Sequence, residues 1–188
     1  MKDKLTLPGP IKRLAAHVHQ AGGTCMLVGG AVVDCLQGRT PKDWDLEVYG
    51  KSYEDLVELF KDYSPKTCGK AFGIIKLSRS ECDGLDVDIS VPRKDNNIGT
   101  SHKDFDVTMD PTMTPKEGAM RRDFTINSLY YNVEEGRIID HFGGLRDLEN
   151  GVLRATDPAT FMEDPLRAFR AMQLLPRKAK TVDPHTVQ

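Results

Sequence analysis

The sequence predicts an α/β (α+β) fold, in which a β-sheet is flanked by helices and followed by a helical segment. Short apolar runs of strand length alternate with stretches in which apolar residues recur at helical spacing. Glycine and proline separate these stretches. The 188 residues suffice for one globular domain, or for one domain and the start of a second.

The N-terminal elements follow from spacing and glycine placement. Apolar residues recur at helical spacing over residues 11–18, and a pair of glycines ends this helix. The apolar run of residues 24–28 predicts a buried strand. Gly29 and Gly30 then turn the chain into a short helix that ends before Gly38.

The middle of the chain predicts three strands and one helix. A strand over residues 43–49 is followed by a helix that Ser52 caps, with Asp55 three residues further on. Two more strands, over residues 72–77 and 85–91, are joined by the polar turn SECDG.

The rest of the chain predicts a long loop, two helices and a strand pair. Residues 92–112 are polar and poor in periodicity, which is typical of a functional or mobile loop. A helix that begins at Thr114 should include RRDFTIN, and residues 128–133 and 136–141 should form a strand pair. The last clear helix should begin at Asp157 and run through FMEDPLRAFRAMQLL.

Composition excludes several classes of protein. No apolar stretch reaches the roughly 20 residues that span a bilayer. The N-terminus lacks the apolar region of a signal peptide, so we expect a cytoplasmic protein that does not contact membranes. The four cysteines stand far apart, without a CxxC pair, which argues against a zinc site and favours reduced, buried thiols.

The formal net charge of −2 provides no overall attraction to nucleic acid. Any contact with RNA must therefore come from local clusters such as Arg93–Lys94 or Arg121–Arg122, or from a region outside this sequence.

Carboxylates on two strands indicate a metal site. Alternation along a strand places Asp43 and Asp45 on one face. Neighbouring carboxylates repel unless a cation lies between them, and their oxygens suit Mg²⁺. A later strand carries Asp86 and Asp88, one of which could complete a two-metal site. Each pair could instead lie on a solvated surface strand.

The glycine turn is the second candidate feature. Gly29 and Gly30 end a strand at a helix N-terminus, where backbone N–H groups can hold a triphosphate. A plain tight turn is the alternative.

Five ordered segments resemble one family. They are LVGGAVVDCLQGRTPKDWDLEVYG, DVDISVPR, RRDFTINSLYYN, IIDHFGGLRDLENGVLR and FMEDPLRAFRA, and they extend from Leu27 to Met172. In this order they resemble the class II tRNA nucleotidyltransferase (CCA-adding enzyme) and bacterial poly(A) polymerase family. The resemblance implies a polymerase-β-like head with a mixed five-stranded sheet over residues 1–150. Residues 151–188 would begin a helical neck that recognises the nucleotide base.

The resemblance also implies roles for individual residues. Gly29 and Gly30 correspond to the turn on the phosphate side, Asp43 and Asp45 to the metal ligands, and Asp88, rather than Asp86, to the third catalytic acidic residue. Two Mg²⁺ ions are expected. Arg122, Asp123 and Asn127 correspond to positions that hold the triphosphate and the ribose. From the residues alone, a solvated basic helix end would be the preferred interpretation of RRD, and the accompanying motifs reverse this.

The segment FMEDPLRAFRA carries the predicted base recognition. Glu163, Arg167 and Arg170 should share one helix face, with Asp164 one turn before Arg167. The resemblance implies that Asp164 and Arg167 present an acceptor and donors to the edge of C or A, with Glu163 orienting the arginine. An ordinary helical Glu–Arg ion pair, worth about 0.3–0.5 kcal/mol, is the alternative.

Two departures from the family pattern stand out. The family's turn reads GGxVRD, whereas this chain has Val33 in place of the arginine, which removes a cation near the triphosphate. Pro176 interrupts the expected long neck helix, and residues 183–188 resemble the opening of a further helix. We expect that the chain stops early and that a body and tail domain, or a partner subunit, is missing.

The sequence leaves several functions open. The first is addition of C and A residues to tRNA 3′ ends, with Mg²⁺, CTP and ATP, and release of pyrophosphate. A poly(A) polymerase or A-adding enzyme would share the same head motifs. An inactive, truncated module that binds nucleotide or RNA is the alternative from another class. A toxin-like transferase fits less well because it would not need a base-reading helix.

Overall fold

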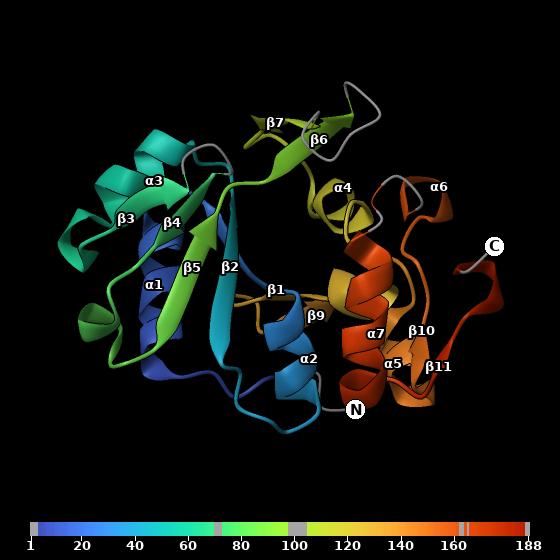
Figure 1. The fold of residues 1–188 in the computed structure, drawn as a ribbon. Helices are drawn as coiled ribbons and strands as arrows, with labels where there is room; N and C mark the ends of the chain where they lie inside the picture. Colours follow the sequence, from blue (N-terminus) through green and yellow to red (C-terminus); the bar gives the residue numbers. More distant parts are fainter. Residues whose placement is uncertain (1–3, 70–72, 98–104, 162–163, 165, 187–188) are drawn as a thin grey trace.

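The structure, a computed structural model, describes residues 4–69, 73–97, 105–161, 164 and 166–186. Its centre is a mixed sheet of seven strands in the order β3-β4-β5-β2-β1-β8-β9 (Figure 1). The predicted α/β class is confirmed, although the sheet has seven strands where we expected five.

Three central strands organise the sheet. They are β1 (Thr24–Val28), β2 (Asp43–Tyr49) and β5 (Asp86–Ser90). Strand β1 pairs antiparallel with β2, and β2 pairs parallel with β5. The register of the parallel pair aligns Asp43 with Asp86 and Asp45 with Asp88.

One edge of the sheet was predicted from the sequence, and the other was predicted only in part. The predicted strand pair is confirmed as β8 (Tyr130–Asn132) and β9 (Arg137–Ile139). At the other edge, β4 (Ile74–Lys76) pairs with β3 (Lys66–Gly69), which we did not predict. Strand β3 has the sequence KTCG, which lacks the apolar alternation of a strand.

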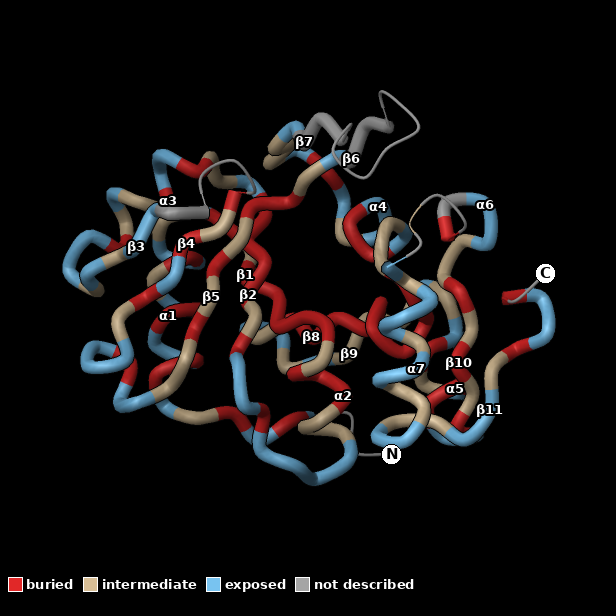
Figure 2. The backbone as a smooth tube through the Cα atoms, in the orientation of Figure 1, coloured by how far each residue is buried: buried red, intermediate tan, exposed pale blue. Residues whose placement is uncertain are grey.

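Helices cover the sheet and close the core. The predicted N-terminal helix is α1 (Gly9–Gln20), which buries its apolar stripe in the core. Helix α2 (Gly30–Leu36) follows the glycine turn, and α3 (Tyr53–Leu59) begins at Ser52. The Ser52 hydroxyl accepts from the Asp55 amide at 3.1 Å, which confirms the predicted capping box. Buried residues concentrate along the central strands (Figure 2).

Residues 92–112 contain two strands rather than an irregular loop. Strand β6 (Arg93–Asn97) pairs antiparallel with β7 (Phe105–Met109) as a separate ribbon beside the main sheet (Figure 1). The prediction was wrong: β6 (RKDNN) carries no apolar pattern, but β7 (FDVTM) alternates apolar and polar residues, which is typical of a strand.

The helix that we expected to include RRDFTIN ends before it. Helix α4 (Pro115–Met120) stops, and the chain passes through a bend into a 3-10 turn (Thr125–Ser128). The carboxylate of Asp123 accepts from the amide of Phe124 at 2.9 Å and from the side chain of Asn127 at 3.0 Å. These local bonds favour a turn over a continuous helix.

The single helix predicted from Asp157 onward is two helices in the structure, and a further helix that we did not predict precedes them. Helix α5 (Gly144–Asn150) leads into β10 (Val152–Leu153), α6 (Pro158–Phe161) and then α7 (Leu166–Lys178). The residue before a proline avoids helical backbone, and Asp164 precedes Pro165. Its carboxylate instead accepts from the Leu166 amide at 2.9 Å, where α7 begins.

The last described residues return to the body of the protein. Strand β11 (Thr181–Val182) pairs parallel with β10, and the predicted helical opening is a 3-10 turn (Pro184–Thr186). Among the described residues, Cys25, Cys35 and Cys82 carry free thiols; Cys25 and Cys82 are buried, as predicted, whereas Cys35 is only partly buried. None of the described helices is both long and apolar enough to cross a bilayer.

Candidate functional site

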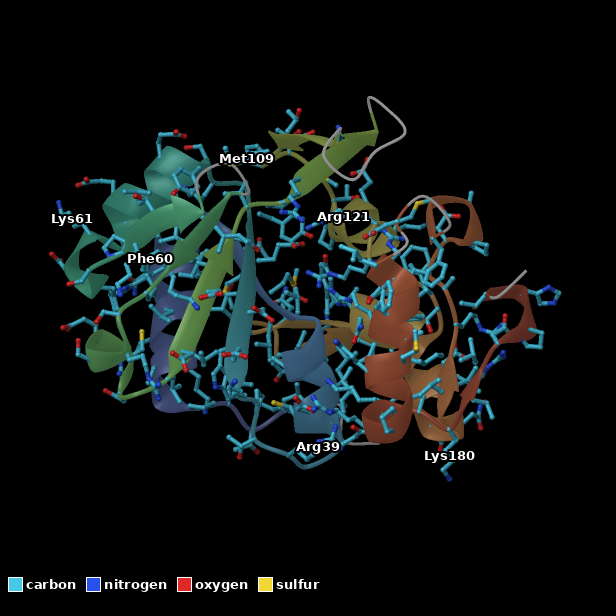
Figure 3. All side chains as sticks on the ribbon, viewed as in Figure 1. Arg39, Phe60, Lys61, Met109, Arg121 and Lys180 are labelled. Atoms are coloured by element: carbon cyan, nitrogen blue, oxygen red, sulfur yellow. The ribbon has the colours of Figure 1, made fainter. Side chains whose placement is uncertain are left out.

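A cavity of about 470 Å³ lies between the central strands and α7. Its volume is in the range of small-molecule sites. Figure 3 shows polar side chains gathered in this space, close to the labelled Arg121. Six of the lining residues are basic and five are acidic. The lining residues are Val28, Gly29, Gly30, Asp45, Glu47, Ile74, Asp88, Ser90, Val91, Arg93, Arg121, Arg122, Asp123, Asn127, Asp164, Arg167, Arg170, Leu174 and Lys178.

The structure brings two of the predicted carboxylates together. Asp45 and Asp88 are aligned on adjacent strands, and both line the cavity. Asp43 lies at the exposed start of β2 and is not among the lining residues. Asp86 forms an ion pair with Arg79 at 3.4 Å. Asp88 lines the cavity and Asp86 does not, and Asp88 is the residue that the resemblance implies as the third catalytic acid.

The carboxylates of the cavity can be tested for a fit to a metal ion. No group of three His, Cys, Asp or Glu side chains in the described part of the chain is arranged to hold a metal ion. Burial raises the pKa of Asp45, and the charges of Asp88 and Asp43 add to this effect although Arg122 opposes it. The Oδ1 atom of Asp88 is buried and accepts no hydrogen bond from any described residue, although the Lys76 amine forms an ion pair with it at 3.4 Å. Mg²⁺ is often bound by one or two carboxylates together with substrate phosphates, so this pair fits the ion.

The glycine turn is flanked by two cations. Gly29 has a φ of +65°, which L side chains rarely adopt. A Cβ at Gly29 would lie 3.2 Å from the guanidinium of Arg122, and a Cβ at Gly30 would lie 3.3 Å from the Lys178 amine. Glycine at both positions thus leaves room for cationic groups beside the main chain.

A buried acid that we did not predict, Glu47, lies behind the cavity. Glu47 is 1% exposed, and it accepts hydrogen bonds from Tyr130 at 2.6 Å, from Tyr49, and from Arg122 at 3.1 Å. Burial opposes its ionisation, but Arg122 and Arg121 together with the hydrogen bonds from Tyr130 and Tyr49 lower its pKa below the usual value. Because Glu47 continues the alternation of Asp43 and Asp45, strand periodicity could have identified it.

The ion pair with Glu47 fixes Arg122 in the wall of the cavity. Burial opposes the charge of Arg122, whereas Tyr130 and Glu47 raise its pKa above the usual value. Its guanidinium also lies 5.1 Å from the centre of the Tyr130 ring. This arrangement keeps a positive charge beside Gly29.

The predicted ribose-binding residues form a local network. Asp123 is 6% exposed, and besides Asn127 it binds the Nε of Arg170 at 2.7 Å. This ion pair ties α7 to the bend that carries RRD. A ribose hydroxyl would share the Asp123 carboxylate with these donors.

The predicted base-reading residues lie at the start of α7. Asp164 and Arg167 both line the cavity, whereas Glu163 lies outside the described residues. One arginine nitrogen, Nη2, donates to the Arg121 carbonyl at 2.9 Å. The other, Nη1, is buried and has no hydrogen-bond partner in the described structure. A buried donor without a partner is costly, so a ligand acceptor here would be favourable.

Comparison with known proteins identifies the family of this fold. The family described as the poly A polymerase head domain matches residues 25–154. The "Multifunctional CCA protein" of Xanthomonas campestris pv. campestris (strain B100) is 37% identical over 153 residues, which is 81% of this chain and 35% of that protein. Its counterpart from Nitrosospira multiformis is 37% identical over 161 residues, covering 86% of this chain and 36% of that protein. The chain thus spans about a third of the length of these relatives.

Solved structures agree with this assignment. The CCA-adding enzyme of Bacillus stearothermophilus, solved with CTP, has a TM-score of 0.79 at 26% identity, covering 96% of this chain and 42% of that one. The CCA-adding enzyme of Thermotoga maritima, complexed with tRNA, has a TM-score of 0.72 at 27% identity, covering 93% and 38%. The chain therefore belongs to the family of the poly A polymerase head domain.

Proposed function

We propose that this chain is the nucleotide-binding head of an RNA nucleotidyltransferase that adds C and A residues to tRNA 3′ ends. CTP and ATP are the donors, and pyrophosphate is released. One observation carries the proposal: a single cavity joins Asp45 and Asp88 to Arg122 and to Asp164 and Arg167. Relatives named as CCA proteins, and CCA-adding enzymes solved with CTP and with ATP, support this choice of substrates.

We assign residues 1–150 to the head domain and residues 151–188 to the beginning of the neck. The family match, which ends at residue 154, supports this division. Helix α7 belongs to the second part and contributes four of the residues that line the cavity, namely Arg167, Arg170, Leu174 and Lys178. A nucleotide would therefore be held by both parts.

Asp45 and Asp88 would hold Mg²⁺ together with phosphate oxygens of the substrate. Asp43, on the same face of β2 as Asp45, is proposed as a further ligand. When bound, Mg²⁺ would activate the 3′-hydroxyl of the RNA and stabilise the charge on the leaving pyrophosphate. The cation would also relieve the repulsion between the two carboxylates.

The chain's own residues would bind and orient the nucleotide. Arg122 would bind triphosphate oxygens beside Gly29 and Gly30, since a guanidinium suits phosphate. Asp123 and Asn127 would bind the ribose, with Arg170 holding Asp123 in position.

Base selection would rest on Asp164 and Arg167. The free Nη1 of Arg167 offers a donor, and the Asp164 carboxylate offers an acceptor. C and A present a complementary donor and acceptor on their pairing edges, whereas G and U would leave polar groups unpaired. Glu163 stays a candidate for orienting Arg167.

Nucleotide incorporation tests the proposal. The protein is incubated with Mg²⁺, a tRNA that ends before CCA, and labelled CTP or ATP. The double variant Asp43→Ala/Asp45→Ala is compared with Asp83→Ala, which removes an exposed carboxylate that does not line the cavity. We expect both nucleotides to be incorporated by the wild type and by Asp83→Ala, and neither by the double variant. Incorporation of ATP alone would favour an A-adding enzyme. Nucleotide binding without incorporation would favour a binding module.

A further inference from the structure

Lys178, which we did not predict as a site residue, lines the cavity beside the glycine turn. In the family pattern an arginine follows the turn, but this chain has Val33, which is 0% exposed and part of the hydrophobic core. Val33 can make no ionic contact with a phosphate. The cation on this side of the turn comes instead from Lys178, at the far end of the chain.

The position of Lys178 is unusual for a lysine. Its side chain is 11% exposed, and lysine is seldom buried unless it is paired. The amine donates to the Gly30 carbonyl at 3.3 Å and lies 3.4 Å from the carboxylate of Asp34. The last turn of α7 is thereby held against the Gly29–Gly30 turn.

The carboxylate of Asp34 does not neutralise Lys178 alone, because it also pairs with Arg39. The carboxylate oxygen nearest to Lys178 already accepts two hydrogen bonds from Arg39, at 2.8 and 3.2 Å. Two cations thus share one carboxylate, which leaves net positive charge at this end of the cavity. On the other side of the turn, Glu47 is likewise shared by two cations, Arg122 at 3.1 Å and Arg121 at 3.5 Å.

The geometry of α7 relates Lys178 to the base-reading arginine. Arg167 and Lys178 are 11 residues apart, which is about three turns and about 16 Å along the helix axis. Both side chains line the same cavity, with Leu174 between them on that face. This span is comparable to the length of an extended nucleoside triphosphate.

We propose that Lys178 binds the triphosphate of the incoming nucleotide at the Gly29–Gly30 turn and supplies the cation that Val33 cannot. This inference rests on the proposed function, because it assumes that the cavity binds nucleotides. One helix would then contact the base near its first turn and the phosphates at its last.

Paired binding measurements test this role. The dissociation constants of CTP and CMP are measured by calorimetry on the full 188-residue chain. Loss of one charged contact should weaken CTP binding about tenfold in Lys178→Met and leave CMP within about twofold. Lys178→Arg should restore CTP binding. Arg177→Met, an exposed neighbour on the same helix, should change neither constant.

The alternative is that Lys178 only ties α7 to the glycine turn. In that case Lys178→Met would weaken CTP and CMP binding by the same factor, and this result would overturn the proposal. Unchanged CTP binding in Lys178→Met, with the wild type binding normally, would overturn it while leaving the proposed function intact. A wild-type chain that binds neither nucleotide would instead refute the proposed function, and the role of Lys178 with it.

Discussion

Replacing Glu47 with glutamine should destabilise the protein strongly. Glu47 is 1% exposed and is the carboxylate that balances the buried guanidinium of Arg122, at 3.1 Å. Removing one partner of a buried ion pair typically costs about 3–5 kcal/mol, because the other charge stays buried without compensation. For a protein of this size that loss corresponds to a fall in Tm of roughly 6–20 °C. Urea unfolding and calorimetry would measure both quantities.

The pH dependence gives the Glu47→Gln experiment a second readout. The folded state lowers the pKa of Glu47, so its charge stabilises the fold above the pKa of an ordinary glutamate. This stabilisation is lost as the pH falls through the lowered pKa. The difference between wild type and variant should therefore be largest at neutral pH and shrink in acid.

A surface ion pair provides the matched control. Glu58 pairs with Lys61, and its side chain is 75% exposed, so Glu58→Gln should change the free energy of unfolding by less than about 1 kcal/mol. The reasoning fails if Glu47→Gln costs no more than Glu58→Gln at pH 7, or if its cost does not depend on pH.

Three further variants probe the same architecture. Gly118→Ala should lower the free energy of unfolding, measured in urea, by about 1–3 kcal/mol, because the added Cβ would clash with the Tyr49 hydroxyl. An unchanged free energy of unfolding would show that neighbouring side chains move to make room for the methyl group. Asp45→Asn should raise Tm at pH 7 but not in acid. The pKa of Asp45 is raised in the folded protein, so the protonated form stabilises the fold and this stabilisation is lost as the pH rises through the raised pKa. Asparagine resembles the protonated form at every pH. An unchanged Tm at pH 7 would contradict this. Arg170→Met leaves Asp123 without its ionic partner and should cost about 1–3 kcal/mol in urea unfolding, whereas a cost near zero would mean that α7 does not depend on this contact.

Local patterns in the sequence predicted much of the fold. Helix α1, strands β1 and β2 and the Ser52 capping box depend on residues that are close in the chain, and they formed as expected. Elements held by distant main-chain pairing were missed. Strands β6 (RKDNN) and β3 (KTCG) have no apolar alternation, so no local signal distinguishes them from loops, whereas β7 (FDVTM) does alternate.

The candidate site, like the fold, was predicted where local patterns decide it and missed where contacts between distant residues decide it. Alternation along each strand predicted the faces of Asp45 and Asp88, but their alignment depends on the register between strands some 40 residues apart. Alternation along β2 places Glu47 on the face of Asp43 and Asp45, but its pairing with Arg122, 75 residues away, depends on tertiary contacts. Lys178 could not be predicted at all, since the turn that it contacts is 148 residues away.

The most direct test of the central claim is the selectivity of nucleotide binding by the chain itself. Calorimetry in the presence of Mg²⁺ would give the dissociation constants of CTP, ATP, GTP and UTP for the wild type and for Arg167→Ala. We predict that the wild type binds CTP and ATP at least about tenfold more tightly than GTP and UTP, because a mismatched edge leaves buried polar groups unpaired. Arg167→Ala should remove that preference. Equal binding of all four nucleotides by the wild type, or an unchanged preference in Arg167→Ala, would contradict the account.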